Sequence, residues 1–166
     1  MYQPEFMQRA IALSASALET PGTEPFGAVV VRDGRIVGEG LNHSLAHFDP
    51  TSHGEVEAIR DACRKLSTVD LSGSTLYTSC EPCALCVAAM GIVGIAQLYY
   101  ASSLEQSGAA FAGLQRQHRH PIDCDLLRSE TGALIHDRAL PAEQRMATEA
   151  TAVLKAWAAQ RVGGPG

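Results

Sequence analysis

The chain has 166 residues, of which 46% are hydrophobic and 19% are charged, and its formal net charge is −5 at pH 7 with histidine neutral. This length and composition predict one globular domain over residues 1–166 with a full hydrophobic core. The acidic balance gives no general attraction for a polyanion, so no nucleic-acid partner is expected, and no stretch approaches the roughly 18 apolar residues of a membrane span. Five cysteines, an odd number, fit a reducing compartment better than a secreted protein, and we expect a cytoplasmic location.

The first half of the chain predicts a helix, a hairpin and a second helix. Apolar residues recur at helical spacing from about 4 to 19. Residues 26–42 then carry two runs rich in β-branched side chains on either side of Asp33-Gly34, a pair typical of a tight hairpin turn. After a polar loop, a second helix is expected over about 53–66, with Thr51 or Ser52 as its N-cap residue.

The second half alternates strands with helices before its pattern weakens. Short strands are predicted at 75–78 and 96–101, and the helix between them begins at a cysteine-rich motif. A short helix is expected within 103–114, and a further strand around 133–135. A closing helix is predicted over about 141–161. Its inward-facing residues are predicted to be Met146, Val153, Leu154 and Trp157.

This alternation predicts a three-layer αβα sandwich around a mixed central sheet of about five strands. The hairpin makes at least one strand pair antiparallel. The two helices that follow the polar loop and the cysteine-rich motif are expected to lie side by side on one face of the sheet.

The cysteine-rich motif, Cys80-Glu81-Pro82-Cys83-Ala84-Leu85-Cys86, is the most informative stretch of the chain. Cys83 and Cys86 stand three residues apart directly after Pro82, and proline is favoured at the first position of a helix. Both sulfurs are then expected on one face of the first helical turn, where unpaired N–H groups favour the thiolate over the thiol. The spacing therefore predicts a metal site.

Upstream of this motif, His53-Gly54-Glu55 opens the second predicted helix. His53, Cys83 and Cys86 supply zinc with three ligands of the kinds it prefers and leave the fourth tetrahedral position for water. Glu55 lies two residues past His53, so it is predicted to reach this water without binding the metal and to transfer its proton. His-x-Glu followed by Pro-Cys-x-x-Cys is the signature of zinc deaminases, so a hydrolytic deaminase with Zn²⁺ as cofactor is predicted.

A non-catalytic interpretation of the same cysteines stays open. Cys80, Cys83 and Cys86 also resemble part of an iron–sulfur cluster run, which needs a fourth thiolate. The cysteines that remain are Cys63, on the core face of a predicted helix, and Cys124. The alternative from another class is thus a zinc-binding or iron–sulfur-binding module, whereas in a zinc deaminase Cys80 is a small buried residue beside the site.

Four other residues are candidates near the motifs. The amide of Asn42 offers a donor and an acceptor to the edge of a heterocycle, and the alternative is a turn residue. Phe26 either stacks on a planar base or begins the core strand. His43 and His47 are additional imidazoles, but nothing in their spacing requires a metal.

Two longer motifs resemble those of the cytidine-deaminase-like superfamily, in its nucleobase-deaminase branch, and most closely those of bacterial guanine deaminases. They read Asp49-Pro50-Thr51-Ser52-His53-Gly54-Glu55 and Thr78-Ser79-Cys80-Glu81-Pro82-Cys83-Ala84-Leu85-Cys86, with Pro25-Phe26-Gly27-Ala28 and Tyr99-Tyr100-Ala101 in support. The resemblance covers roughly residues 6–114. It implies that His53, Cys83 and Cys86 bind zinc, that Glu55 shuttles protons, that Asn42 binds the base, and that the protein is a homodimer.

The sequence departs from this family at two positions. Gly54 stands where the family has alanine, and its backbone N–H is still expected to contact the substrate. The aspartate that guanine deaminases carry shortly after Tyr99-Tyr100-Ala101 is missing, and Glu105 is the nearest replacement. The expected substrate is a free aminated heterocycle, with guanine first and cytosine, a pterin or a triazine-like base as alternatives. A tRNA-adenosine deaminase is the related alternative.

Overall fold

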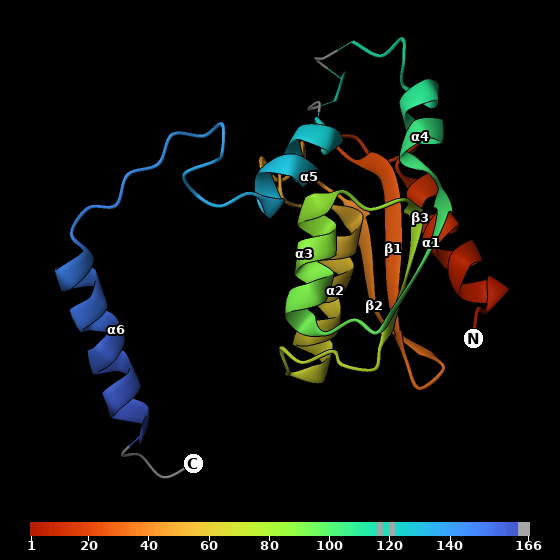
Figure 1. Ribbon diagram of the computed structural model, residues 1–166. Coiled ribbons are helices and arrows are strands. Elements are labelled where there is room, and N and C mark those ends of the chain that lie inside the picture. The colour runs from red at the N-terminus through yellow and green to blue at the C-terminus, as the bar shows by residue number, and fades with distance from the viewer. Residues whose placement is uncertain (116–117, 120–121, 163–166) are drawn as a thin grey trace. The chain divides into compact units, whose positions relative to one another are not determined.

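The structure, a computed structural model, describes residues 1–115, 118–119 and 122–162 of the chain. The chain forms two compact units, residues 1–131 and a C-terminal unit that begins at Gly132. The first unit holds the sheet and the helices packed on it (Figure 1). Across the described parts of the chain, no helix combines the length and the apolar character needed to cross a membrane.

Four strands form one mixed sheet in the order β2-β1-β3-β4. They are β1 (Glu24–Arg32), β2 (Arg35–Asn42), β3 (Thr75–Cys80) and β4 (Gln97–Ser102). β1 is antiparallel to both β2 and β3, whereas β3 and β4 are parallel. The mixed sheet is therefore confirmed, but the described residues form four strands instead of about five. Residues 133–135 are not a strand, because the chain already turns at residue 135.

A two-residue turn joins β1 to β2, as the sequence predicted. Asp33 has a φ of 51° and Gly34 a φ of 70°, the left-handed pair that matches the twist of a hairpin. Irregularities between Glu24 and Gly27 and between Val30 and Val31 shift the pairing along the hairpin. As a result, Glu24 lies opposite Asn42 at the end farthest from the turn.

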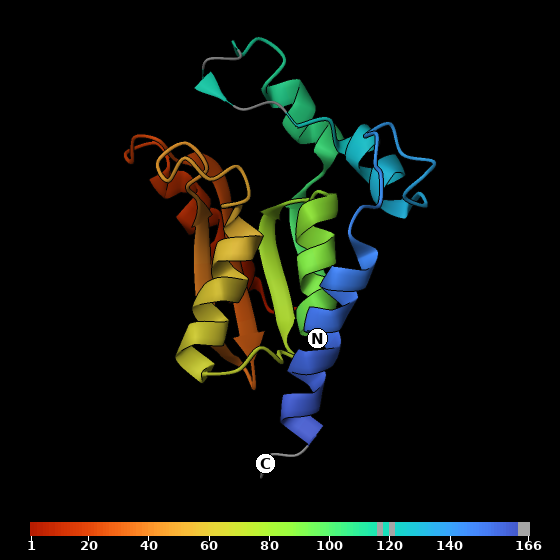
Figure 2. The same ribbon diagram turned by 90° about the vertical axis from the view of Figure 1, so that its left-hand side faces the viewer.

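The sheet is covered by helices on both faces. α1 (Pro4–Ser16) packs on one face, and α2 (Gly54–Leu66) and α3 (Ala84–Val93) lie side by side on the other (Figures 1 and 2). Successive side chains of a strand point to opposite faces, so Val29 and Val31 join the core under α1, while Ala28 and Val30 join the core under α2 and α3. The predicted three-layer arrangement is confirmed.

Two glycines allow α2 to lie directly on β2. A Cβ atom at Gly38 or at Gly40 would overlap the backbone of α2 at Ala58. The close approach holds the first turn of α2 against the end of β2. This is the place where the polar loop delivers its motif.

The remaining helices differ in part from the predictions. α4 (Leu104–Ala110) confirms the short helix, and α5 (Cys124–Gly132) was not predicted. α6 (Ala147–Val162) begins later than the expected start near residue 141, because Met146 has a φ of 52°, which an α-helix does not adopt.

The predicted inward-facing side chains of the closing helix are a second difference. They are exposed in the structure: Met146, Val153, Leu154 and Trp157. α6 is the one helix that lies wholly within the described part of the C-terminal unit, so that unit offers it no partner helix or strand.

Candidate metal centre

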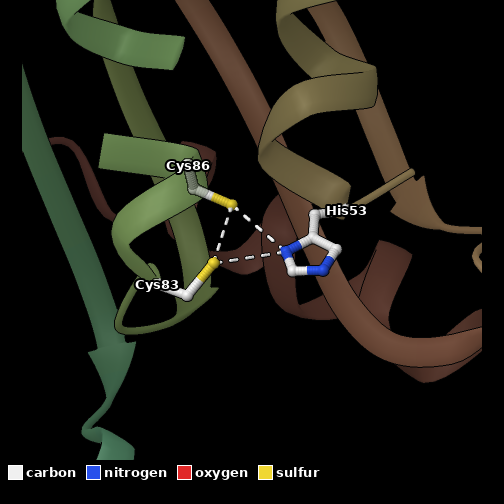
Figure 3. Close-up of side chains that lie close together, drawn as sticks. All are labelled: His53, Cys83 and Cys86. Atoms are coloured by element: carbon white, nitrogen blue, oxygen red, sulfur yellow. Dashed lines mark hydrogen bonds between the residues drawn. The ribbon is translucent and has the colours of Figure 1, made fainter. Parts of the chain in front are cut away.

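Three ligand atoms meet where α2 and α3 begin (Figure 3). Nδ1 of His53 lies 3.5 Å from Sγ of Cys83 and 3.4 Å from Sγ of Cys86, and the two sulfurs are 3.8 Å apart. All three residues are buried. Within residues 1–115, 118–119 and 122–162, this is the one group of three or more potential ligand residues that could hold a metal ion.

Two of the three ligands occupy N-cap positions. His53 and Cys83 have extended backbones directly before α2 and α3, and neither side chain forms a capping hydrogen bond. The N-cap of α2 is thus His53 and not Thr51 or Ser52, and Pro82 precedes the helix instead of opening it. Because these side chains turn away from the helix ends, they are free to point at a shared ligand, while the N–H groups of both helices favour negative charge there.

The separations fit a tetrahedral zinc ion. Zn–S bonds of about 2.3 Å and Zn–N bonds of about 2.0–2.1 Å place two sulfurs about 3.8 Å apart and a nitrogen and a sulfur about 3.6 Å apart. The observed distances agree with both values, and one imidazole with two thiolates is a common donor set for zinc. The predicted ligand set is therefore brought together, with one tetrahedral position left for a non-protein ligand.

Cys80 takes no part in this cluster. Its side chain is buried, and its Sγ contacts the carbonyl oxygen of Ser103 at 4.0 Å. No fourth thiolate joins His53, Cys83 and Cys86 in the described part of the chain. The iron–sulfur alternative consequently has no support in this geometry.

Hydrogen bonds within the cluster shift the pKa values of its members. The bond to Cys86 lowers the pKa of the Cys83 thiol to about 4, with the imidazole of His53 acting in the same direction. The same bond, and then burial, raises the pKa of the Cys86 thiol. One sulfur is thus a thiolate at neutral pH, and a divalent cation stabilises the second thiolate by displacing its proton.

Glu55 lies beside the cluster without belonging to it. Its Oε2 is 3.4 Å from Sγ of Cys86, and its Oε1 accepts a hydrogen bond from the Thr78 hydroxyl at 3.3 Å. The residue is 5% exposed, and burial raises the pKa of its carboxyl group. A buried carboxyl group with a raised pKa is suited to accepting and returning a proton.

Asn42 and Phe26 line the same cavity as His53, Cys83 and Glu55. Asn42 is 4% exposed, and its Oδ1 accepts a hydrogen bond from the backbone N–H of Ser44. The ring of Phe26 packs edge-to-face against Phe111. Both predicted residues therefore share one cavity with the metal ligands.

Gly54 is the first residue of α2 and has no room for a side chain. A Cβ atom at this position would overlap the carbonyl oxygen of Phe26 in β1. Glycine stands at position 54, where the family has alanine, and α2 lies unusually close to β1 at this point.

Glu105 is not brought to the site. Leu104 and Ser107, three residues apart on one face of α4, line the cavity, whereas Glu105 is exposed on another face. His43 and His47 stack on each other with ring centroids 4.8 Å apart and do not join the metal cluster.

An ion pair in the cavity wall escaped the sequence analysis. Glu24 and Arg119 form it at 3.0 Å. The pair joins positions 95 residues apart, so no local pattern indicates it. The sequence could place Glu24 only by counting strand pairs outward from the Asp33-Gly34 turn. The two irregularities in β1 shift this pairing, so the count from the turn is displaced at Glu24.

Sequence comparisons relate the chain to known proteins. Residues 2–102 match the family described as the cytidine and deoxycytidylate deaminase zinc-binding region. The guanine deaminase of Bacillus subtilis (strain 168) is 36% identical over 157 residues, which are 95% of this chain and 94% of that protein. The tRNA-specific adenosine deaminase of Agrobacterium fabrum (strain C58) is 37% identical over 110 residues, 66% of this chain and 72% of that protein.

Comparison with solved structures relates the chain to deaminases in three dimensions as well. The X-ray structure of the Bacillus subtilis guanine deaminase matches with a TM-score of 0.78 and 35% identity, over 95% of this chain and 94% of that chain. A mutant protein crystallised in complex with 8-azaguanine matches with a TM-score of 0.60 and 28% identity, over 66% of this chain and 63% of that chain. The mixed sheet and its flanking helices are therefore shared with a solved guanine deaminase.

Proposed function

The chain belongs to the cytidine and deoxycytidylate deaminase family and carries its zinc-binding residues, and from this premise we propose that it deaminates a free aminated nucleobase, with guanine as the leading substrate. One observation carries the choice of guanine. Similarity to a guanine deaminase extends over 95% of the chain, whereas similarity to a tRNA-specific adenosine deaminase covers 66%. A structural relative also binds 8-azaguanine, a purine base.

The charge of the protein supports a small substrate over RNA. The chain has 13 Lys and Arg against 18 Asp and Glu. Proteins that bind a phosphate chain depend on clustered basic side chains, and their affinity falls steeply with salt. A cavity beside the metal ligands that combines an aromatic ring, Phe26, with the amide of Asn42 suits a ligand of one or two rings.

His53, Cys83 and Cys86 would hold the zinc ion, which when bound supplies the Lewis acidity that activates a water molecule for attack on the amino-bearing carbon. Glu55 then accepts the proton of that water, because its carboxylate lies at the edge of the ligand cluster. It gives this proton to the adjacent ring nitrogen, then takes the second proton of the same water from the hydroxyl on the attacked carbon and passes it to the departing amine, so that ammonia leaves as a neutral molecule. Thr78 holds the carboxylate in place through its hydroxyl.

Three other residues position the base in this proposal. The amide of Asn42 bonds to the edge of the ring, and the ring of Phe26 packs against its face. The backbone N–H of Gly54, the first residue of α2, donates to the base from a free helix end. Each of these groups is directed by a strand end or a helix start, which are rigid parts of the fold.

We also propose a homodimer that forms through α3. This helix has no charged residue, and it buries Cys86 and Met90 while Val87 and Ile92 on its other side remain 53% and 84% exposed. A helix that is apolar all round is normally buried on all sides, so a second copy is the partner that supplies the cover.

Five cysteines without a disulfide among them support a cytoplasmic location.

Single-turnover assays with two kinds of substrate test the proposed function. Purified protein is mixed with a panel of free bases (guanine, cytosine, a pterin and an aminotriazine) and separately with a tRNA anticodon stem-loop, and released ammonia is measured. We expect guanine to react fastest and the stem-loop not to react. Efficient deamination of the stem-loop without turnover of any free base would contradict the proposal, and no ammonia from either would favour a non-catalytic zinc protein.

A further inference from the structure

The cavity contains a buried acid that the proposed mechanism does not use. Glu24 is 6% exposed and lies opposite Asn42 across the β1–β2 hairpin, so the two side chains share one end of the sheet. Both line the cavity that holds the metal ligands and Glu55. The charge of Glu24 contributes to the raised pKa of His53, but among the described residues Glu24 forms no hydrogen bond with the metal ligands. We therefore place it beside a part of the bound base other than the carbon that reacts.

Arg119 fixes this acid in place. Its Nε donates to Oε2 of Glu24 at 3.0 Å, and its guanidinium lies 5.2 Å from the ring centre of Phe26 and 4.7 Å from that of Phe111. Contact with two aromatic rings restricts the guanidinium, which in turn orients the carboxylate. In the described part of the chain Arg119 is the hydrogen-bond partner of Glu24, and it occupies one of the two carboxylate oxygens.

A second polar group in the same wall, besides Oε1 of Glu24, has no hydrogen-bond partner among the described residues. The hydroxyl oxygen of Ser44 is buried and forms no hydrogen bond within the described residues, although Ser44 lines the cavity. Buried polar atoms are nearly always paired, and those that are not often meet a ligand or water. Among the residues that the structure describes, Oε1 of Glu24 and the Ser44 hydroxyl therefore form a polar wall with unused hydrogen-bonding capacity.

We propose that Glu24 is a specificity-determining residue that accepts a hydrogen bond from the imidazole N–H of a free purine, at the nitrogen that carries the sugar in a nucleoside. This inference rests on the proposed deamination of a free base. When the amino-bearing carbon of guanine lies at the metal ligands, the N–H groups beside it belong to the reacting end of the ring. The imidazole N–H is the donor left for an acid elsewhere in the cavity.

This assignment predicts a preference for free bases over substituted ones. A base substituted at that nitrogen leaves the buried carboxylate without its partner and places a bulky group against Glu24. Sites built to hydrogen-bond a substrate N–H reject analogues that lack it, because their own buried polar groups are then left unpaired.

The test compares guanine with 9-methylguanine, which lacks only this N–H. For the wild type we expect kcat/KM to be at least about 10²-fold higher for guanine. In Glu24→Ala the ratio should fall to about tenfold or less, because guanine loses its acceptor while 9-methylguanine gains the vacated space. Glu24→Gln, which keeps the shape of the side chain, should give an intermediate ratio and serves if the alanine variant does not fold.

Glu39→Ala is the matched control, since Glu39 also pairs with an arginine, Arg9, but does not line this cavity. It should leave the ratio at the wild-type value. A parallel fall in activity toward both substrates in Glu24→Ala, with the ratio unchanged, would overturn the inference and leave the proposed function standing. Failure of the wild type to release ammonia from any free purine would overturn both.

Discussion

Cys80 and Cys83 belong to one short motif, yet the structure gives them different surroundings. Sγ of Cys83 lies 3.5 Å from Nδ1 of His53, whereas Sγ of Cys80 contacts the Ser103 carbonyl. We therefore expect Cys83→Ala to lose zinc and Cys80→Ala to keep about one zinc per chain. Metal analysis of the two purified variants checks this, and loss of zinc from Cys80→Ala alone would mean that the ligand pair is wrongly assigned.

Gly54 gives a prediction about packing. A Cβ atom there would overlap the Phe26 carbonyl, so Gly54→Ala should lower the free energy of unfolding by about 1–3 kcal/mol, as overpacked sites do. It should also lower activity, because α2 carries Glu55 and follows His53. Urea unfolding measures the first effect.

Gly108→Ala in α4 is the control for that substitution, since nothing lies within 4 Å of the added Cβ atom. There the change should be neutral or stabilising by up to about 1 kcal/mol, because glycine is a poor helix former. Equal effects at Gly54 and Gly108 would show that the close approach of α2 to β1 does not constrain the protein.

At single residues, the sequence predicted the metal-ligand cluster and two residues of the cavity wall, Asn42 and Phe26, but not the ion pair in that wall. His53, Cys83 and Cys86 follow from spacing and helix starts, which are local properties. The partnership of Glu24 and Arg119 depends on how distant segments meet, and the segment around Arg119 has no periodicity from which its position follows. Glu105 seemed suitable by its place in the sequence, but the face of α4 on which it lies excludes it.

Among the elements, one ion pair connects α1 to β2 across the edge of the sheet. Arg9 binds both carboxylate oxygens of Glu39 at 2.7 Å, and this hydrogen bonding lowers the pKa of Glu39. A lowered folded-state pKa means that the stabilisation is present at neutral pH and is lost as the pH falls through the acidic range below the ordinary value of 4.5. Because both side chains are partly exposed, it should be worth less than about 1 kcal/mol.

The corresponding measurement is the free energy of unfolding of wild type and Arg9→Gln as a function of pH. Arg9→Gln should be slightly less stable at pH 7, and the difference should shrink as the pH falls below 4.5 and Glu39 takes up its proton. A difference that stays constant over this range would show that it does not come from the charge on Glu39.

Elements whose ends have strong local signals were predicted well. Asp33-Gly34 supplies the positive φ values of the hairpin turn, and Gly94, with a φ of 79°, ends α3. α5 and the start of α6 lack such signals. α6 begins only after Met146, because the backbone of this residue is left-handed. Methionine favours helices, so the start of α6 depends on more than the helix propensity of single residues.

For the whole molecule, the exposed apolar side of α3 leads to a prediction about assembly. Ile92 is 84% exposed on this helix, so Ile92→Glu should convert a dimer into a monomer by charging the proposed contact. Leu18→Glu is the control, because Leu18 is 85% exposed but follows α1, on the opposite face of the sheet from α3. Size-exclusion chromatography with light scattering checks both, and a dimer that persists in Ile92→Glu would show that α3 is not the interface.

The central claim is that one carboxylate, Glu55, moves the protons for a zinc-dependent deamination. The direct measurement is ammonia release from guanine by wild type and Glu55→Gln, with zinc determined on the same samples. We predict that both proteins hold about one zinc per chain, and that the variant loses activity by a factor of at least about 10⁴, because glutamine cannot accept the proton of the water. A Glu55→Gln protein that keeps its zinc and most of its activity would contradict the account.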